Sequence, residues 1–251
     1  MGIAGGGAQE QARRATARVE RLRRAPATDG LREKLAAAER RQHAWTAGAE
    51  GERLVAQALA ALEPHGWRLL HDVRWPGRAK ANLDHVAIGP GGVVVVDAKN
   101  WSGPVTVRDG VLRQGSHRRD EALDGVARAA ADMAALLPPR HRSATRGVLC
   151  LAAQRGRPAP TAAGVVVVGR EDLARHLRSL PRTLSAAAVD ELTAALRDQL
   201  DGATSPALPE PAQDAPDRGV RLVLALTVVL VVALLVGGFA AFVSQQLGAA
   251  G

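Results

Sequence analysis

Two apolar runs on either side of a glycine- and proline-rich turn constrain this chain most. The runs occupy residues 86–88 and 93–96 and flank Gly89-Pro90-Gly91-Gly92, a pattern that predicts a β-hairpin. In a symmetric turn Gly89 faces Gly92, and each further pair lies one residue farther from the turn on both strands. Because the runs are apolar at successive positions, we expect strands that are buried on both faces.

Charged and amide side chains end both strands at matched distances from the turn. The symmetric register places Asp84 opposite Asp97 and Asn82 opposite Lys99. Side chains alternate along a strand, so Asp84, Asp97 and Lys99 share one face. Opposed like charges destabilise a sheet, and a divalent cation together with the Lys99 ammonium would neutralise them. A bulge at the turn would shift the pairing by one residue, and a surface hairpin with solvated acids is the alternative that the apolar runs disfavour.

Composition narrows the classes of partner. The 251 residues are 47% hydrophobic, which is enough for a core, and the net charge of +8 favours polyanions, either nucleic acid or anionic lipid. With four Trp, two Phe and no Tyr, the chain has few aromatic residues for a base-stacking sheet of the RRM or OB type. The single cysteine, Cys150, excludes an intramolecular disulfide and a cysteine-based zinc site.

Residues 1–46 form a basic N-terminal region. Its Ala-, Arg- and Glu-rich pattern predicts two exposed helices separated by residues 26–30, which begin with Pro26 and end with Gly30. The basic segment that begins with Arg13 and ends with Arg41 suits contact with nucleic acid or with anionic lipid. A solvated charged face or a short coiled coil is the alternative.

Residues 47–200 are predicted to form an α/β domain. Glu52 lies one turn before Val55, on the apolar side of the first helix, so we expect its side chain to point toward the core. The periodicity predicts helices at 49–62, 121–137, 171–180 and 185–200 and strands at 67–73, 83–88, 93–99, 147–152 and 164–168.

The C-terminal region predicts a membrane anchor. Residues 201–217 are a proline-rich linker, and a stretch of 22 residues without charge begins at Leu222 and ends at Val243. At 1.5 Å per residue this stretch is about 33 Å long, close to the ~30 Å hydrocarbon core. We therefore predict a transmembrane helix within 218–243 and a short tail at 244–251, with a buried core helix as the weaker alternative. Arg218 and Arg221 precede the stretch, so the N-terminal domain of this single-pass protein is expected in the cytoplasm.

The order of the acidic motifs suits metal-dependent hydrolysis of phosphodiesters. In that chemistry carboxylates hold Mg²⁺ on the phosphate, the ion lowers the pKa of an attacking water, and a lysine offsets developing charge. Three motifs are present here in order: Gly48-Ala49-Glu50-Gly51-Glu52, Asn82-Leu83-Asp84-His85, and Gly91-Gly92 followed by Asp97-Ala98-Lys99-Asn100-Trp101-Ser102-Gly103. Over residues 47–170 the chain resembles the nuclease-related domain (NERD) family, within the PD-(D/E)xK nuclease superfamily.

The resemblance implies a restriction-endonuclease-like core, a mixed sheet flanked by helices, and assigns roles to the motif residues. It implies metal ligation by Asp84 and Asp97 with support from Glu52, and Lys99 as the catalytic base or charge stabiliser. Asn82 and Asn100 are the supporting residues, and Mg²⁺ or Mn²⁺ is the cofactor. The family commonly has Gln in place of Asn82 and Glu in place of Asp97. His85 lies on the strand face opposite Asp84, so we expect it to pack in the core.

These features together predict a membrane-anchored, metal-dependent nuclease that hydrolyses DNA or RNA. The alternative is a non-catalytic membrane scaffold that keeps the nuclease fold and binds nucleic acid or lipid.

Overall fold

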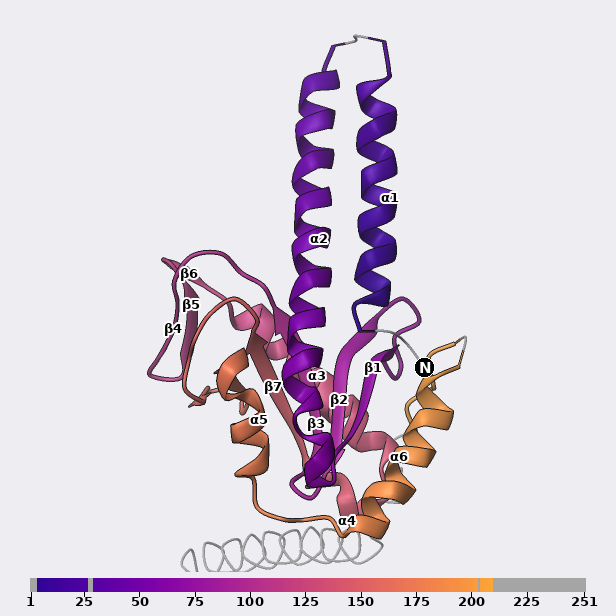
Figure 1. The fold of residues 1–251 in the computed structure, drawn as a ribbon, viewed down its shortest axis with the longest axis vertical. Coiled ribbons are helices and arrows are strands. Elements are labelled where there is room, and N and C mark those ends of the chain that lie inside the picture. Colours follow the sequence, from indigo (N-terminus) through magenta and orange to yellow (C-terminus); the bar gives the residue numbers. More distant parts are fainter. Residues whose placement is uncertain (1–3, 27–28, 203, 210–251) are drawn as a thin grey trace, which may run out of the picture. The chain divides into compact units, whose positions relative to one another are not determined.

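The structure, a computed structural model, describes residues 4–26, 29–202 and 204–209 (Figure 1). The chain divides into two units, residues 1–209 and 210–251, and the second lies outside the described residues. The predicted transmembrane helix at 218–243 and the tail at 244–251 therefore lie outside them as well. Among the described helices, none combines the length and the apolar character that crossing a bilayer requires.

A mixed six-stranded sheet forms the centre of the first unit. Its strand order is β1-β2-β3-β7-β9-β8. The first three strands pair antiparallel, β3 pairs parallel with β7, β7 pairs parallel with β9, and β8 is antiparallel to β9. The prediction of an α/β fold with a mixed sheet flanked by helices is confirmed. The strands are β1 (Arg68–Arg74), β2 (Asn82–Gly89), β3 (Gly92–Lys99), β7 (Thr145–Leu151), β8 (Ala159–Pro160) and β9 (Val166–Gly169).

Helices cover both faces of this sheet. The four valines of β3 show why the strand is apolar at successive positions: Val94 and Val96 pack against α2 and α5, whereas Val93 and Val95 pack against α3 and α6. Full burial of such a side chain contributes roughly 1.5–3 kcal/mol. The covering helices are α2 (Leu31–Ala60), α3 (Asp120–Leu136), α5 (Arg170–Arg178) and α6 (Ala186–Leu200).

The β2–β3 hairpin has the predicted symmetric register. Gly89 pairs with Gly92 and the ladder continues to His85 with Val96. Pro90 and Gly91 form the turn, and the positive φ angle, 117°, occurs at Gly92. The pairing is therefore not shifted by a bulge.

The predicted helix at 49–62 begins earlier than expected. Two basic helices, α1 (Gly6–Arg23) and α2, are present as predicted, but α2 is continuous from Leu31 to Ala60 and crosses the predicted boundary at residue 46. The two helices pack side by side and extend beyond the sheet (Figure 1). Small buried residues, Ala15 and Val19 on α1 and Ala38 on α2, allow this close packing, and the Gly48 and Gly51 positions do not interrupt the helix.

Several short elements were not predicted. A second sheet of three antiparallel strands follows β3 in the chain, and its only fully buried side chain in the strands is Leu112. Such short, largely polar strands leave little periodicity to recognise. The unpredicted elements are β4 (Val105–Arg108), β5 (Val111–Gln114), β6 (His117–Arg118), β8 of the central sheet, the 3₁₀ helix η1 (Glu63–His65) and α4 (Pro139–Arg142).

The hairpin turn generates a stability prediction. Gly92 has a positive φ angle, which strains any residue with a side chain, and an added Cβ would collide with the carbonyl oxygen of Ala144. Gly92→Ala should therefore lower the free energy of unfolding by about 3 kcal/mol or more. Gly164→Ala is the matched control, because Gly164 has φ 74° with no atom within 4 Å of an added Cβ, and strain alone costs about 1–2 kcal/mol. Denaturant unfolding of both variants measures the difference, and equal losses would contradict the collision.

Candidate active site

The predicted acidic residues meet at one end of the central hairpin. Glu52 on α2, Asp84 on β2 and Lys99 on β3 line one cavity of about 630 Å³. Asp97 does not line this cavity, but it lines a smaller one together with Asp84. The helix α2 and the β2–β3 hairpin therefore bring the four predicted catalytic side chains together.

The hairpin ladder ends immediately before the acids. Its last pair is His85 with Val96, so the ladder does not reach the predicted pairs of Asp84 with Asp97 and of Asn82 with Lys99. Asp84 Oδ2 instead accepts a hydrogen bond of 2.8 Å from the Ala98 backbone N–H. This bond holds the Asp84 carboxylate against the strand segment that carries Asp97 and Lys99.

Lys99 and Asp97 form an ion pair that is largely shielded from solvent. Lys99 Nζ lies 2.7 Å from Asp97 Oδ2, and the two side chains are only 30% and 29% exposed. Apart from this ion pair, the buried Asp97 Oδ2 has no partner among the described residues. An oxygen of this kind remains able to accept a further electrostatic partner.

Burial and mutual repulsion shift the titration of these groups. Burial raises the pKa of Asp84 well above its usual value, and the charges of Asp97 and Glu52 raise it further. Burial, followed by the neighbouring Asp72 carboxylate, raises the pKa of Glu52 to about 7. Burial lowers the pKa of Lys99, but the charges of Asp97 and Asp84 outweigh it, so the net shift is upward and Lys99 stays protonated at neutral pH.

Close packing between α2 and the end of β3 positions Glu52. A Cβ added to Gly51 would lie 2.7 Å from the Asn100 Cβ, so only glycine permits this approach of the helix. Asn100 Nδ2 also donates a hydrogen bond of 2.8 Å to the Ala47 carbonyl oxygen. The supporting residue Asn100 therefore fastens the strand to the helix that carries Glu52.

A further acid, Asp72 on β1, was not predicted. It lies between the ladder pairs His71–His85 and Val73–Leu83 and adopts a positive φ of 49°. Its two oxygens accept hydrogen bonds of 2.7 Å, one from Asn82 Nδ2 and one from the Gly7 N–H at the start of α1. The predicted supporting residue Asn82 thus contacts Asp72 rather than Lys99. No feature of the strand sequence marks this backbone angle.

The far wall of the cavity is aromatic and cationic, and sequence reasoning noted only Trp101 there. Arg119 Cζ lies 5.2 Å from the centre of the Trp101 ring. Arg119 Nε donates 3.0 Å to Gln114 Oε1, and Gln114 Nε2 donates 2.7 Å to the Ser102 carbonyl oxygen. Trp45 of α2 also lines the cavity. The small sheet that contains Gln114 therefore holds Arg119 in place.

His85 is a core residue, as predicted. It is fully buried on the face opposite Asp84, with its Nδ1 2.9 Å from Nδ1 of His71. Burial, followed by the nearby His71, lowers the pKa of His85 to about 3. The ring is therefore neutral under ordinary conditions and takes no part in the cavity.

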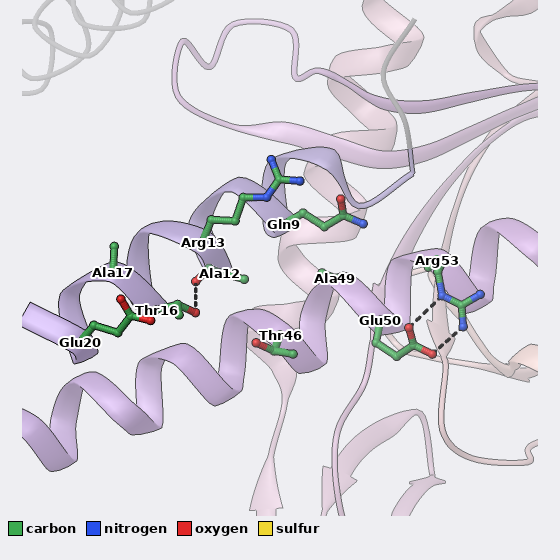
Figure 2. Close-up of a pocket in the computed structure, with 10 residues that line it drawn as sticks. All are labelled: Gln9, Ala12, Arg13, Thr16, Ala17, Glu20, Thr46, Ala49, Glu50 and Arg53. Carbon is green, nitrogen blue, oxygen red and sulfur yellow. Dashed lines mark hydrogen bonds and ion pairs between the residues drawn. The ribbon is translucent and has the colours of Figure 1, made fainter. Parts of the chain in front are cut away.

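A separate cavity of about 550 Å³ lies between α1 and α2 (Figure 2). Its lining combines small residues such as Ala12, Thr16 and Ala49 with charged ones, of which Glu50 is held by Arg53 through hydrogen bonds of 2.6 and 2.8 Å. None of the predicted catalytic residues lines this space. Glu50 and Glu52 thus have different surroundings although both belong to one sequence motif.

The carboxylates do not form a complete set of metal ligands by themselves. Within the described ranges, no group of three or more His, Cys, Asp or Glu side chains is arranged to hold a metal ion. A cation at Asp84 and Asp97 would need further oxygen ligands from water or substrate. Mg²⁺ is commonly held in this way, by one or two carboxylates together with substrate phosphates.

The raised pKa of Asp84 generates a prediction about stability. A carboxyl whose native pKa is raised binds its proton more tightly in the folded than in the unfolded state, so stability is lost as pH rises above the unfolded value of about 3.9. Asp84→Asn resembles the neutral form, and in EDTA at pH 8 it should raise the free energy of unfolding by about 1–3 kcal/mol. The gain should shrink toward pH 4. Mn²⁺ should stabilise the wild type more than the variant.

The matched control is Asp124→Asn, because Asp124 is exposed on α3 outside the cavity. This substitution should leave the free energy of unfolding unchanged at pH 8 and at pH 4. A lower stability of Asp84→Asn than of the wild type at pH 8 in EDTA would contradict the repulsion described above.

Comparison with known proteins places the site within a recognised domain. The model of the nuclease-related domain matches residues 47–152, a range that contains Glu52, Asp84, Asp97 and Lys99. No curated protein and no solved structure matches the chain. Over residues 47–152 the chain is therefore similar to the nuclease-related domain.

Proposed function

We propose that this domain hydrolyses phosphodiester bonds of DNA or RNA in the presence of Mg²⁺ or Mn²⁺, on a core of the restriction-endonuclease-like, PD-(D/E)xK type. One observation carries the proposal: Asp84, Asp97 and Lys99 lie together at the end of the central hairpin, and Glu52 lines the same cavity as Asp84 and Lys99. A nuclease-related domain matches the segment that contains all four.

The residues present fit a divalent cation. Asp84 and Asp97 offer the oxygen ligands that Mg²⁺ and Mn²⁺ accept, and apart from the Lys99 ion pair the buried Asp97 Oδ2 has no partner among the described residues. Burial, followed by the charges of Asp97 and Glu52, raises the pKa of Asp84, and a cation would offset this negative charge. When bound, the cation would lower the pKa of an attacking water and reduce the charge on the phosphate.

Glu52 and Lys99 supply complementary roles around the phosphate. With a pKa of about 7, Glu52 can accept a proton from water at neutral pH. Lys99 keeps its proton, so its ammonium is suited to stabilising charge that develops on the phosphoryl oxygens rather than to acting as the base.

The exposed cations of the α1–α2 hairpin support a nucleic-acid partner. All ten Arg and Lys side chains between Arg13 and Arg41 are exposed, and ion pairs involve three of them, Arg14, Arg23 and Arg24. We propose that the remaining cations contact phosphates, and anionic lipid is the other polyanion of matching charge. The same surface would serve a non-catalytic scaffold, which is the alternative function. The cations without an ion pair among the described residues are Arg13, Arg18, Arg21, Arg32, Lys34, Arg40 and Arg41.

We also propose that residues 222–243 anchor the protein in a membrane as a single span, with the N-terminal domain in the cytoplasm. The support is the sequence alone: 22 residues without charge follow Arg218 and Arg221. The proline-rich linker at 201–217 would then keep the nuclease-related domain close to the inner surface of the membrane.

The catalytic proposal predicts the behaviour of two substitutions in the full-length protein. Asp97→Asn should abolish cleavage of labelled DNA and RNA in Mn²⁺ and also abolish thermal stabilisation by Mn²⁺, because it removes a ligand charge. Lys99→Ala should lower turnover about 100-fold or more while keeping the stabilisation by Mn²⁺. Asp124→Asn is the matched control and should cleave like the wild type. Undiminished cleavage by the Asp84→Asn, Asp97→Asn double variant would overturn the assignment.

The proposal that the α1–α2 hairpin contacts phosphates predicts a change in the salt dependence of nucleic-acid binding. Replacing Arg18, Arg21, Arg40 and Arg41 with Gln should flatten the plot of log affinity against log salt, by about 0.7 per lost phosphate contact for a single strand and about 0.9 for a duplex. Because α1 contacts Asp72 through Gly7, substitution is preferable to deletion of the hairpin. The matched control replaces four exposed arginines elsewhere, Arg108, Arg128, Arg157 and Arg182, with the same change in net charge. Equal slopes in the two variants would assign the hairpin to lipid or protein contacts.

A further inference from the structure

The cavity that holds the acids has a second wall that phosphate hydrolysis does not explain. Trp45, Trp101 and Arg119 line the same space as Glu52 and Lys99. We propose that nucleic acid enters this cavity as a single strand, with one unpaired base stacked on Trp45 and a neighbouring phosphate bound by Arg119. The inference rests on the proposed function, since it names the class of substrate for the same site.

The Trp45 side chain is exposed and is accessible to a ligand. Its exposed fraction is 39%, and Leu208, at 37%, is the other exposed large hydrophobic residue in the described part of the chain. An exposed indole leaves apolar area in contact with water, which favours stacking with a planar partner. Trp45 precedes Glu52 by seven residues on one helix, so the two share a helix face about 10 Å apart along the axis. A base on Trp45 would therefore lie beside the acids.

Arg119 provides a cation with no acidic partner. Its guanidinium stacks over Trp101, and its Nε and Nη2 both donate hydrogen bonds to the neutral amide oxygen of Gln114. Within residues 4–26, 29–202 and 204–209 it makes no ion pair, whereas Lys99 is paired with Asp97. A half-buried guanidinium that is fixed by a neutral group keeps its full charge for an anion. A phosphate of the bound strand would supply the negative charge with which Arg119 can pair.

The size of the cavity favours a single strand. Its volume of about 630 Å³ is in the range that holds one small ligand, which suits a nucleotide or two of one strand. A paired base would first have to leave its duplex, at an energetic cost. Base stacking on an aromatic ring tolerates any base, so the geometry favours recognition of an unpaired strand without strong sequence preference.

Binding of fluorescein-labelled oligo(dT) and of a duplex of equal length to the full-length protein in EDTA tests this inference without requiring cleavage. The wild type should bind the single strand more tightly than the duplex, and binding should quench tryptophan fluorescence. Trp45→Ala should weaken single-strand binding about 10-fold and reduce the quenching, while Trp45→Phe should recover most of the affinity. Arg119→Gln should weaken binding and lower the salt slope by about 0.7. Leu208→Ala is the control of equal exposure and should bind like the wild type.

The outcomes separate this inference from the proposed function. Preference for the duplex, or unchanged single-strand binding by Trp45→Ala, would overturn the inference even if the protein cleaves nucleic acid in Mn²⁺. Single-strand binding that depends on Trp45 would uphold it even if no cleavage is found, and the proposed nuclease activity would then be wrong.

Discussion

The pairing of β3 along both of its edges is the constraint on which the rest of the structure depends. Antiparallel pairing with β2 and parallel pairing with β7 place this strand inside the sheet, and its alternating valines form the contact with helices on both faces. Such a strand satisfies its backbone groups and buries side chains on two sides. It ends in Asp97 and Lys99, so a strand that is paired on both edges and buried on both faces also positions the candidate site.

The site combines this buried strand with unfavourable charge. Burial, together with the charges of neighbouring carboxylates, raises the pKa values of Asp84 and Glu52, and the Lys99 ammonium offsets only part of this effect. Perturbed titration of this kind concentrates at functional sites, where stability is sacrificed for chemistry. The tight contacts of Gly51 with Asn100 hold Glu52 within this charged environment. Apolar side chains in this place would make the fold more stable but would not bind a phosphate.

The α1–α2 hairpin and the candidate site are physically connected. The N–H of Gly7 at the start of α1 donates to Asp72, which in turn raises the pKa of Glu52. The exposed arginines of α1 and α2 thus belong to the same body as the acids, and Trp45 lies on α2 between the basic part of the hairpin and Glu52. A strand held by the hairpin could continue along α2 into the cavity, which unites the proposed contacts with phosphate, base and scissile bond.

The sequence by itself determined what depends on local periodicity: the register of the β2–β3 hairpin, the strands β1, β7 and β9 to within two residues, the core position of His85, and the shared face of Asp97 and Lys99. Only the tertiary structure decided where the ladder ends, the positive φ of Asp72, the continuity of α2 through residue 46, and the meeting of Trp45, Trp101 and Arg119. The physical reason is range. Side-chain alternation and turn geometry act between near neighbours, whereas a cavity wall, a strained backbone angle and a helix end result from packing between segments that are distant in the chain.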